Sequence, residues 1–208
     1  MSGGKRVDRK IMAIIKPDYS LYYKFIETYA SRGYQGIDRT DPLIRELESM
    51  TEINNQFFHV GDILQMKIFF TSMRSTRMIG IEPDDLNPYQ IIEITHPDNM
   101  ERHNLARAKM FKVAHDLLMA EKGNALMSFN MNARNGAGGY SELLFQLYFF
   151  YSTVPYKSVL IFKVYTLLDW MNNKKHDNFC YIGKDMSFFR YPDEKMLLVG
   201  NQLSECEF

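Results

Sequence analysis

Residues 56–72, QFFHVGDILQMKIFFTS, constrain the fold of this chain more than any other stretch. Aromatic and β-branched residues dominate positions 57–60 and 67–71, and such residues fit a pleated, half-buried surface. Between the two runs, Gly61 tolerates a positive φ and Asp62 can bond its own backbone two residues on. The stretch therefore predicts two strands joined by a turn.

Helices are predicted on both sides of this strand pair. Those after it lie at residues 73–79, 89–94 and 98–122, and those before it begin near Pro17 and at Pro42. Asp41 precedes a proline and predicts an N-cap. Asp98, with Glu101 three residues on, forms a capping box that predicts the start of the long helix.

Three further strands are predicted after the long helix, at residues 125–132, 140–152 and 159–170. The first alternates apolar and polar residues, whereas the other two are apolar on both faces. Since the strands form two blocks separated by helices, both blocks are expected to share one antiparallel sheet. The predicted fold class is α+β.

The charge balance argues against one class of function, and the cysteine content indicates the cellular environment. Lys+Arg and Asp+Glu number 25 each, so the chain lacks the excess of basic residues that is typical of a domain that binds nucleic acid by itself. Cys180 and Cys206 are the two cysteines, which gives no disulfide framework and suits a reducing, cytoplasmic environment. No apolar run is long enough to span a bilayer, so no membrane contact is predicted.

The order of these motifs over residues 56–170 resembles a PAS domain. The resemblance is carried by FFHVGD and KIFFTS followed by MRSTRMIGIEPDDL, by THPDN opening the long helix, and by the three closing strands. It implies a five-stranded antiparallel sheet with helices on one face, plus the N-terminal helices. The later stretches YIGKDMSFFRYPDEK and GNQLSECEF resemble the linker and the first residues of the helix-turn-helix domain in bacterial LuxR-type regulators.

The resemblance implies a division of the chain and a function. The division is a helical extension at 1–55, a PAS-like sensory domain at 56–170, a linker packed on it at 171–202, and the start of a helix-turn-helix domain at 203–208. The function is non-enzymatic: the domain senses a small molecule or a protein signal and reaches DNA only through a C-terminal domain that is absent here.

An apolar core or ligand pocket is predicted between the sheet and the long helix. One face of each strand and one stripe of the helix supply its residues. They are Phe58, Val60, Ile68, Phe70, Met110, Ala114, Leu118, Met127 and Phe129.

The cofactor is unknown, and neither a cofactor nor a metal ion is predicted. His96, Asp98 and His103 suggest a metal cluster, but a helix start explains them better. Haem is the alternative, because family members that bind it use a histidine on the long helix, where His103 and His115 lie. A small enzyme on a related α+β fold ranks last, since it needs titratable groups that converge in the cavity.

A homodimer is predicted from the excess of apolar surface. The long helix covers one sheet face, and the other needs cover from the N-terminal helices, from a second subunit, or from both. The predicted dimer residues form one stripe of the first helix and are Tyr22, Phe25, Ile26 and Tyr29. The alternative is a monomer whose own helices cover that face.

Overall fold

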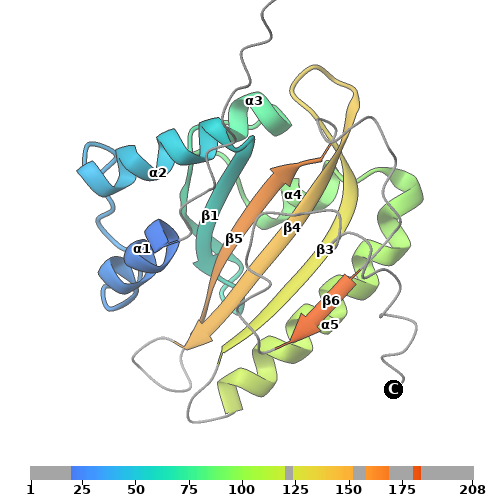
Figure 1. Ribbon diagram of the computed structural model, residues 1–208. Coiled ribbons are helices and arrows are strands. Elements are labelled where there is room, and N and C mark those ends of the chain that lie inside the picture. The colour runs from blue at the N-terminus through green and yellow to red at the C-terminus, as the bar shows by residue number, and fades with distance from the viewer. Residues whose placement is uncertain (1–19, 120–123, 152–157, 169–179, 184–208) are drawn as a thin grey trace, which may run out of the picture.

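The computed structural model describes residues 20–119, 124–151, 158–168 and 180–183 (Figure 1). Its helices are α1 (Ser20–Ala30), α2 (Pro42–Ile53), α3 (Ser75–Ile79), α4 (Pro88–Glu93), the 3-10 helix η1 (Pro97–Asn99) and α5 (Met100–Met119). Its strands are β1 (Gln56–Asp62), β2 (Lys67–Thr71), β3 (Asn124–Arg134), β4 (Tyr140–Tyr151), β5 (Val159–Leu167) and β6 (Cys180–Gly183). None of the described helices is long and apolar enough to cross a membrane.

The strands form one antiparallel sheet in the order β2-β1-β5-β4-β3-β6. β1 pairs with β5 along its whole length, which confirms that the early and late strands share a sheet. The α+β class and the five predicted strands are therefore confirmed. β6 is an addition, because it lies within the predicted linker, and it extends the sheet beside residues 126–129 of β3. The rest of the predicted linker and the predicted helix-turn-helix start lie outside the described residues.

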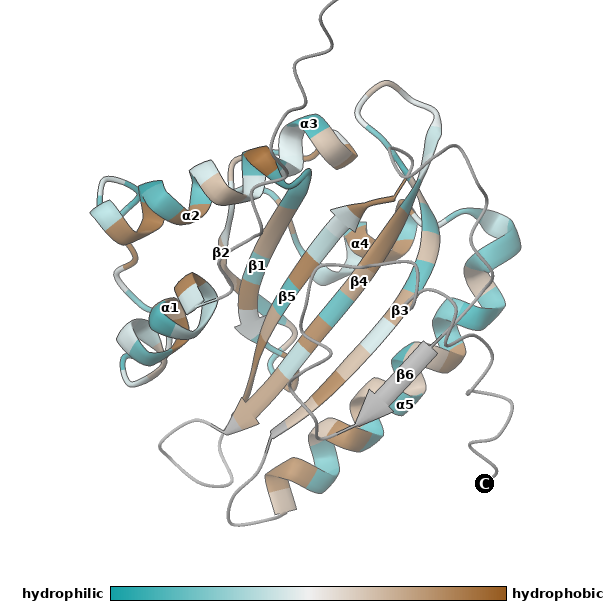
Figure 2. Cartoon of the chain, viewed as in Figure 1, coloured by the Kyte–Doolittle hydropathy of each residue, from teal (hydrophilic) through white to brown (hydrophobic). Residues whose placement is uncertain are grey.

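The helices cover the sheet from both sides (Figure 1). α3, α4 and α5 enclose a first core with one sheet face, and α1 and α2 enclose a second core with the other. Figure 2 shows hydrophobic segments along the central strands β4 and β5, interrupted by more hydrophilic ones. Strands that are apolar on both faces fit this arrangement, because each face has its own helical cover.

Local capping explains where two helices begin. Asp41 accepts a hydrogen bond from the Leu43 backbone N–H at 2.8 Å, which confirms the predicted N-cap of α2. The prediction for the long helix was wrong in its capping residue. His96 accepts from the Asp98 backbone N–H at 3.1 Å, so the imidazole, and not the Asp98 carboxylate, caps this turn.

Gly61 lies where the β1–β2 register shifts, between Val60 and Gly61. A Cβ atom at this position would lie 2.2 Å from the carbonyl oxygen of Lys67. We expect Gly61→Ala to lower the free energy of unfolding by about 3 kcal/mol, because backbone must move to admit the methyl group. Chemical denaturation measures the change. The matched control is Gly139→Ala, whose Cβ would meet the Asn135 side chain at an ordinary 3.6 Å. Equal losses in the two variants would contradict the close approach.

Candidate functional site

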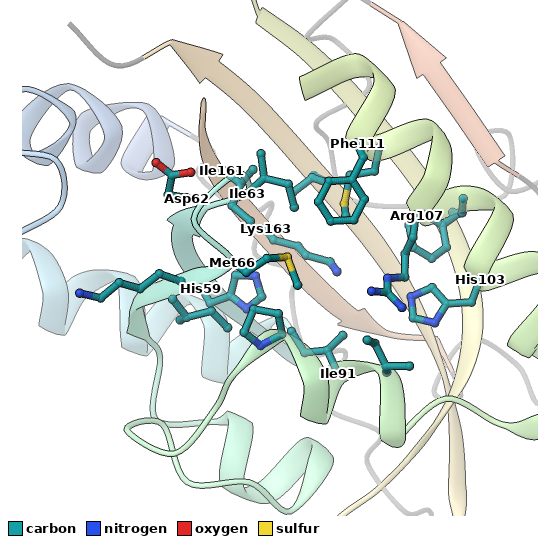
Figure 3. Close-up of a pocket in the computed structure, with 18 residues that line it drawn as sticks. His59, Asp62, Ile63, Met66, Ile91, His103, Arg107, Phe111, Ile161 and Lys163 are labelled. Atoms are coloured by element: carbon teal, nitrogen blue, oxygen red, sulfur yellow. The ribbon is translucent and has the colours of Figure 1, made fainter. Parts of the chain in front are cut away.

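A cavity lies between the sheet and α5, where α4 and the β1–β2 turn approach them (Figure 3). Its volume is about 50 Å³, which is room for roughly four water-sized groups. Its inner wall holds His59, His103, Phe129, Leu147, Ile161 and Lys163, and its outer part includes Met66, Lys67, Pro88, Ile92, Arg107 and Phe111. The cavity is therefore apolar with a few charged or polar groups, as small-molecule sites are.

The alternation of side chains along each strand determines which polar groups point into the cavity. Side chains of β5 point alternately to the two faces, so Lys163 shares the α5 side with Ile161 and Tyr165. His59 of β1 is the register partner of Lys163 and lines the same cavity. Two central, neighbouring strands thus place a lysine and a histidine next to each other under the helix.

Lys163 is buried without a counter-ion. Its side chain is 7% exposed, and Nζ lies 4.6 Å and 4.9 Å from the ring centroids of Phe145 and Tyr165. Within the described residues its ammonium has no hydrogen-bond or ion-pair partner. Burial, and to a smaller extent the Arg107 guanidinium, lowers the pKa of Lys163 to about 7. Figure 3 shows the Lys163 and Arg107 cationic groups pointing toward each other across the cavity.

His103 is held neutral and is hydrogen-bonded to Thr95. The Thr95 hydroxyl lies 3.2 Å from the Ile91 carbonyl oxygen and 2.7 Å from His103 Nδ1. The hydroxyl has one proton, so it either donates to the carbonyl and accepts from His103 Nδ1–H, or donates to an unprotonated Nδ1. Burial, followed by the charges of Lys163 and two arginines, lowers the pKa of His103 to about 3.

His59 is also neutral. Its ring is buried, and Nδ1 lies 3.5 Å from the Tyr165 hydroxyl, beyond the usual length of a strong hydrogen bond. Burial first, and then the Lys163 charge, lowers the pKa of His59 well below its ordinary value. The positive charge around the inner cavity therefore comes from Lys163 and Arg107, and not from the histidines.

Asp62 is the carboxylate that lines this cavity, but it does not neutralise Lys163. Its Oδ1 accepts hydrogen bonds from the backbone N–H groups of Leu64 and Gln65, at 2.8 Å and 3.0 Å. Asp62 pairs with Leu160, three positions along β5 from Lys163, a separation of about 10 Å along a strand. Figure 3 shows the carboxylate pointing away from the Lys163 ammonium.

The predicted pocket residues fall into three groups. Ile68, Met110 and Phe129 line the cavity. Ala114, Leu118 and Met127 lie in the first core beside it. Phe58, Val60 and Phe70 lie in the second core, on the opposite sheet face.

The assignment of Phe58, Val60 and Phe70 to the cavity was wrong, for two reasons. β1 is buried along both faces, so the hydrophobic pattern of the strand does not identify the face toward α5. The register shift between β1 and β2 also separates Ile68 from Phe70, which strict alternation would place on one face. The α5 side of β1 is formed by Phe57 and His59 instead.

The cavity also contains residues that the sequence patterns did not predict, namely Lys163, Arg107 and His59. A signal for Lys163 was present, because it is a charged residue inside the apolar strand VLIFKVYTL. A lysine in such a place is rarely buried without a reason, so it marks a candidate site. Arg107 carried no comparable signal, since exposed arginines are ordinary on an amphipathic helix.

The predicted dimer residues are covered by the chain itself. Tyr22 and Phe25 are fully buried, Tyr29 is 3% exposed, and Ile26 packs partly buried against the same second core. The Phe25 ring centroid lies 5.5 Å from that of Phe58. The assignment of this stripe to a dimer surface is therefore corrected: α1 and α2 cover the second sheet face in the same chain, as the monomer alternative required.

The cavity does not fit haem or a metal cluster. His103 lines the cavity, but His115 is exposed, with 68% of its side chain accessible. Room for roughly four water-sized groups is far less than a haem macrocycle needs. Among the described residues, no three His, Cys, Asp or Glu side chains lie close enough together to hold a metal ion.

Comparison with known proteins does not assign this chain to a family. No family model matches the sequence. The search among curated proteins likewise returns no match. The function is therefore inferred from the fold and from the cavity beneath α5.

Proposed function

We propose that this chain is a signal-sensing module that binds a small ligand in the cavity between the sheet and α5. The observation that carries the proposal is the pairing of an apolar cavity with two cationic side chains, Lys163 and Arg107, that face each other. Such a site is formed by one helix and the central strands, so an occupant contacts both.

The fold and the sequence support a sensory role. An antiparallel sheet with α5 across one face is compatible with the PAS-like arrangement that the motifs of residues 56–170 resemble. The resemblance of residues 203–208 to the start of a helix-turn-helix domain supports transcriptional regulation as the output. The domain would then act non-enzymatically, and DNA would be bound by another domain.

The mechanism is a population shift between two positions of α5. Arg107, Met110 and Phe111 lie on α5, whereas Lys163 and Ile161 lie on β5. A ligand that contacts both elements stabilises the helix position in which its contacts are complete, by its difference in affinity for the two positions. The altered helix position is then the signal that a downstream domain reads.

Native mass spectrometry of the chain purified from its own host tests this function. We expect a mass above that of the 24.5 kDa chain, from a retained small molecule. Ala106 lines the cavity, whereas Ala108 is exposed on the same helix. Ala106→Leu should therefore lose the extra mass, and Ala108→Leu should keep it. A wild-type chain at its bare mass that also gains no thermal stability from a broad compound library would contradict a sensor.

A second candidate is an enzyme that uses the Lys163 amine. The enzyme was ranked last because the predicted inward residues were apolar, yet the structure brings Lys163, His59 and His103 to one cavity. An amine whose pKa is lowered to about 7 can attack a carbonyl carbon, with loss of water, to form an imine. Reductive trapping with cyanoborohydride and small aldehydes or ketones should label Lys163 if this activity exists, and leave it unlabelled otherwise.

The predicted homodimer loses the uncovered sheet face that motivated it, because α1 and α2 cover that face in the same chain. Because Tyr22 and Phe25 are buried in the second core, charged substitutions there would unfold the chain instead of separating subunits. Sedimentation of the wild-type chain at micromolar concentration tests the dimer directly. A monomer throughout would contradict it.

A further inference from the structure

We propose that the ligand of this cavity is a small carboxylate with a short apolar body, whose head group lies between Lys163 and Arg107. The inference rests on the proposed ligand-binding function and deepens it by naming the chemical class. Its support is the charge, the geometry and the size of the cavity.

The two cationic side chains of the cavity favour an anionic ligand. Lys163 is buried and Arg107 is half-buried, their cationic groups face each other, and Lys163 carries its charge below about pH 7. The described residues place no carboxylate between them, since Asp62, whose Oδ1 accepts from the Leu64 and Gln65 backbone and whose Oδ2 has no hydrogen-bond partner, points away from Lys163. Two like charges in a partly apolar site repel, and an anion between them converts that repulsion into two attractions.

The geometry favours a carboxylate over a larger oxyanion. A guanidinium offers a planar fork of N–H donors that matches the two oxygens of a carboxylate, and an ammonium adds a further donor. His103 is neutral and hydrogen-bonded to Thr95, so it adds no positive charge to the site. A phosphate brings three terminal oxygens and up to two charges, and this wall offers only Lys163 and Arg107 to pair with them.

The remaining walls select the body of the ligand. Ile63, Ile91, Phe111 and Ile161 surround the space beyond the two cations. A volume of about 50 Å³ admits only a short chain in the arrangement shown. The cavity therefore suits an acid with a few apolar carbon atoms better than a sugar acid or a nucleotide.

Binding is expected to depend on pH through Lys163. The titratable or charged groups that face the cavity from the surrounding elements are His59 and Asp62 (β1), Lys67 (β2), His103 and Arg107 (α5) and Tyr165 (β5). Burial keeps both histidines and Tyr165 neutral near pH 7. Lys163, with a pKa of about 7, is then the inner group that changes charge between pH 6 and 9.

Isothermal titration calorimetry of the whole chain tests the ligand class. The probes are butyrate and valerate, each compared with its matched primary alcohol. We expect at least one acid to bind about tenfold or more tightly than its alcohol. Its affinity should fall about tenfold from pH 6 to pH 8, because the free amine must take up a proton to pair with the anion. Titrations in buffers of different ionisation enthalpy should show this proton uptake above pH 7.

Two variants test whether Lys163 is responsible for the preference for acids over alcohols. Lys163→Met should lose the preference for acid over alcohol and the pH dependence while retaining the alcohol, and melting curves check that it folds. Lys24→Met, an exposed change on α1, should bind as the wild type does. Equal affinity for acids and alcohols would overturn the inference and leave the sensor proposal standing. Failure of every acid to bind at millimolar concentration would overturn it too, and native mass spectrometry would then show whether another ligand occupies the site.

Discussion

Replacing Lys163 by Met is expected to stabilise the protein at pH 6 by roughly 4 kcal/mol, since a lowered pKa measures the cost of burying the charge. Burial lowers the pKa of Lys163 from 10.5 to about 7, so the folded state binds its proton less tightly than the unfolded chain does. A methionine of similar size fills the same space without a charge. It also removes the repulsion from Arg107.

The advantage of Lys163→Met should shrink as the pH rises. Between pH 7 and pH 9 the unfolded chain keeps the Lys163 proton that the folded chain releases, so wild-type stability rises by about 1.4 kcal/mol per pH unit. The variant lacks this contribution. Urea denaturation at pH 6, 7, 8 and 9 measures both, with Lys24→Met as the exposed control. A Lys163→Met variant that is less stable than the wild type at pH 6 would show that the ammonium is solvated or paired.

Phe129→Ala is expected to lower the free energy of unfolding by roughly 3–5 kcal/mol, the usual range for removing a buried aromatic ring. Phe129 is 5% exposed, and its ring stacks on Phe145 with centroids 5.0 Å apart and planes 4° apart. It also lies against the His103 ring, 5.9 Å between centroids. Its loss would enlarge the cavity and remove cover from the buried imidazole.

Denaturant unfolding measures the Phe129→Ala change, and Leu105→Ala is the control. Leu105 lies on α5 with 47% of its surface exposed, so truncating it should cost less than about 1 kcal/mol. A loss below about 1 kcal/mol for Phe129→Ala would contradict the burial of this ring between the sheet and α5.

The sequence predicted the elements and their sheet because those depend on local patterns. Residues 67–71 became β2, and the strand predicted from residue 140 begins at Tyr140 as β4. The Asp41 cap depends on two adjacent residues and was equally predictable. The early and late blocks of strands were expected to share one sheet, and the pairing of β1 with β5 joins the two blocks.

The faces of the strands and the polar groups of the cavity were less predictable. β1 is buried on both sides, so its sequence cannot show that His59 turns toward α5 while Phe58 turns toward α1. That choice is made by the register with β5, which sets His59 opposite Lys163. The cover of the second sheet face by α1 similarly depends on tertiary packing of its aromatic stripe.

Direct titration of the lysine side chains tests the central claim, that the inner wall of the cavity holds a buried Lys163 amine to which no described residue supplies a counter-ion. Selective carbon-13 labelling of lysine Cε allows each amine to be followed by NMR, and the signal absent from Lys163→Met identifies Lys163. We predict that this signal titrates near pH 7 in the ligand-free chain. Titration of Lys163 near the ordinary lysine value of about 10.4 would contradict the account.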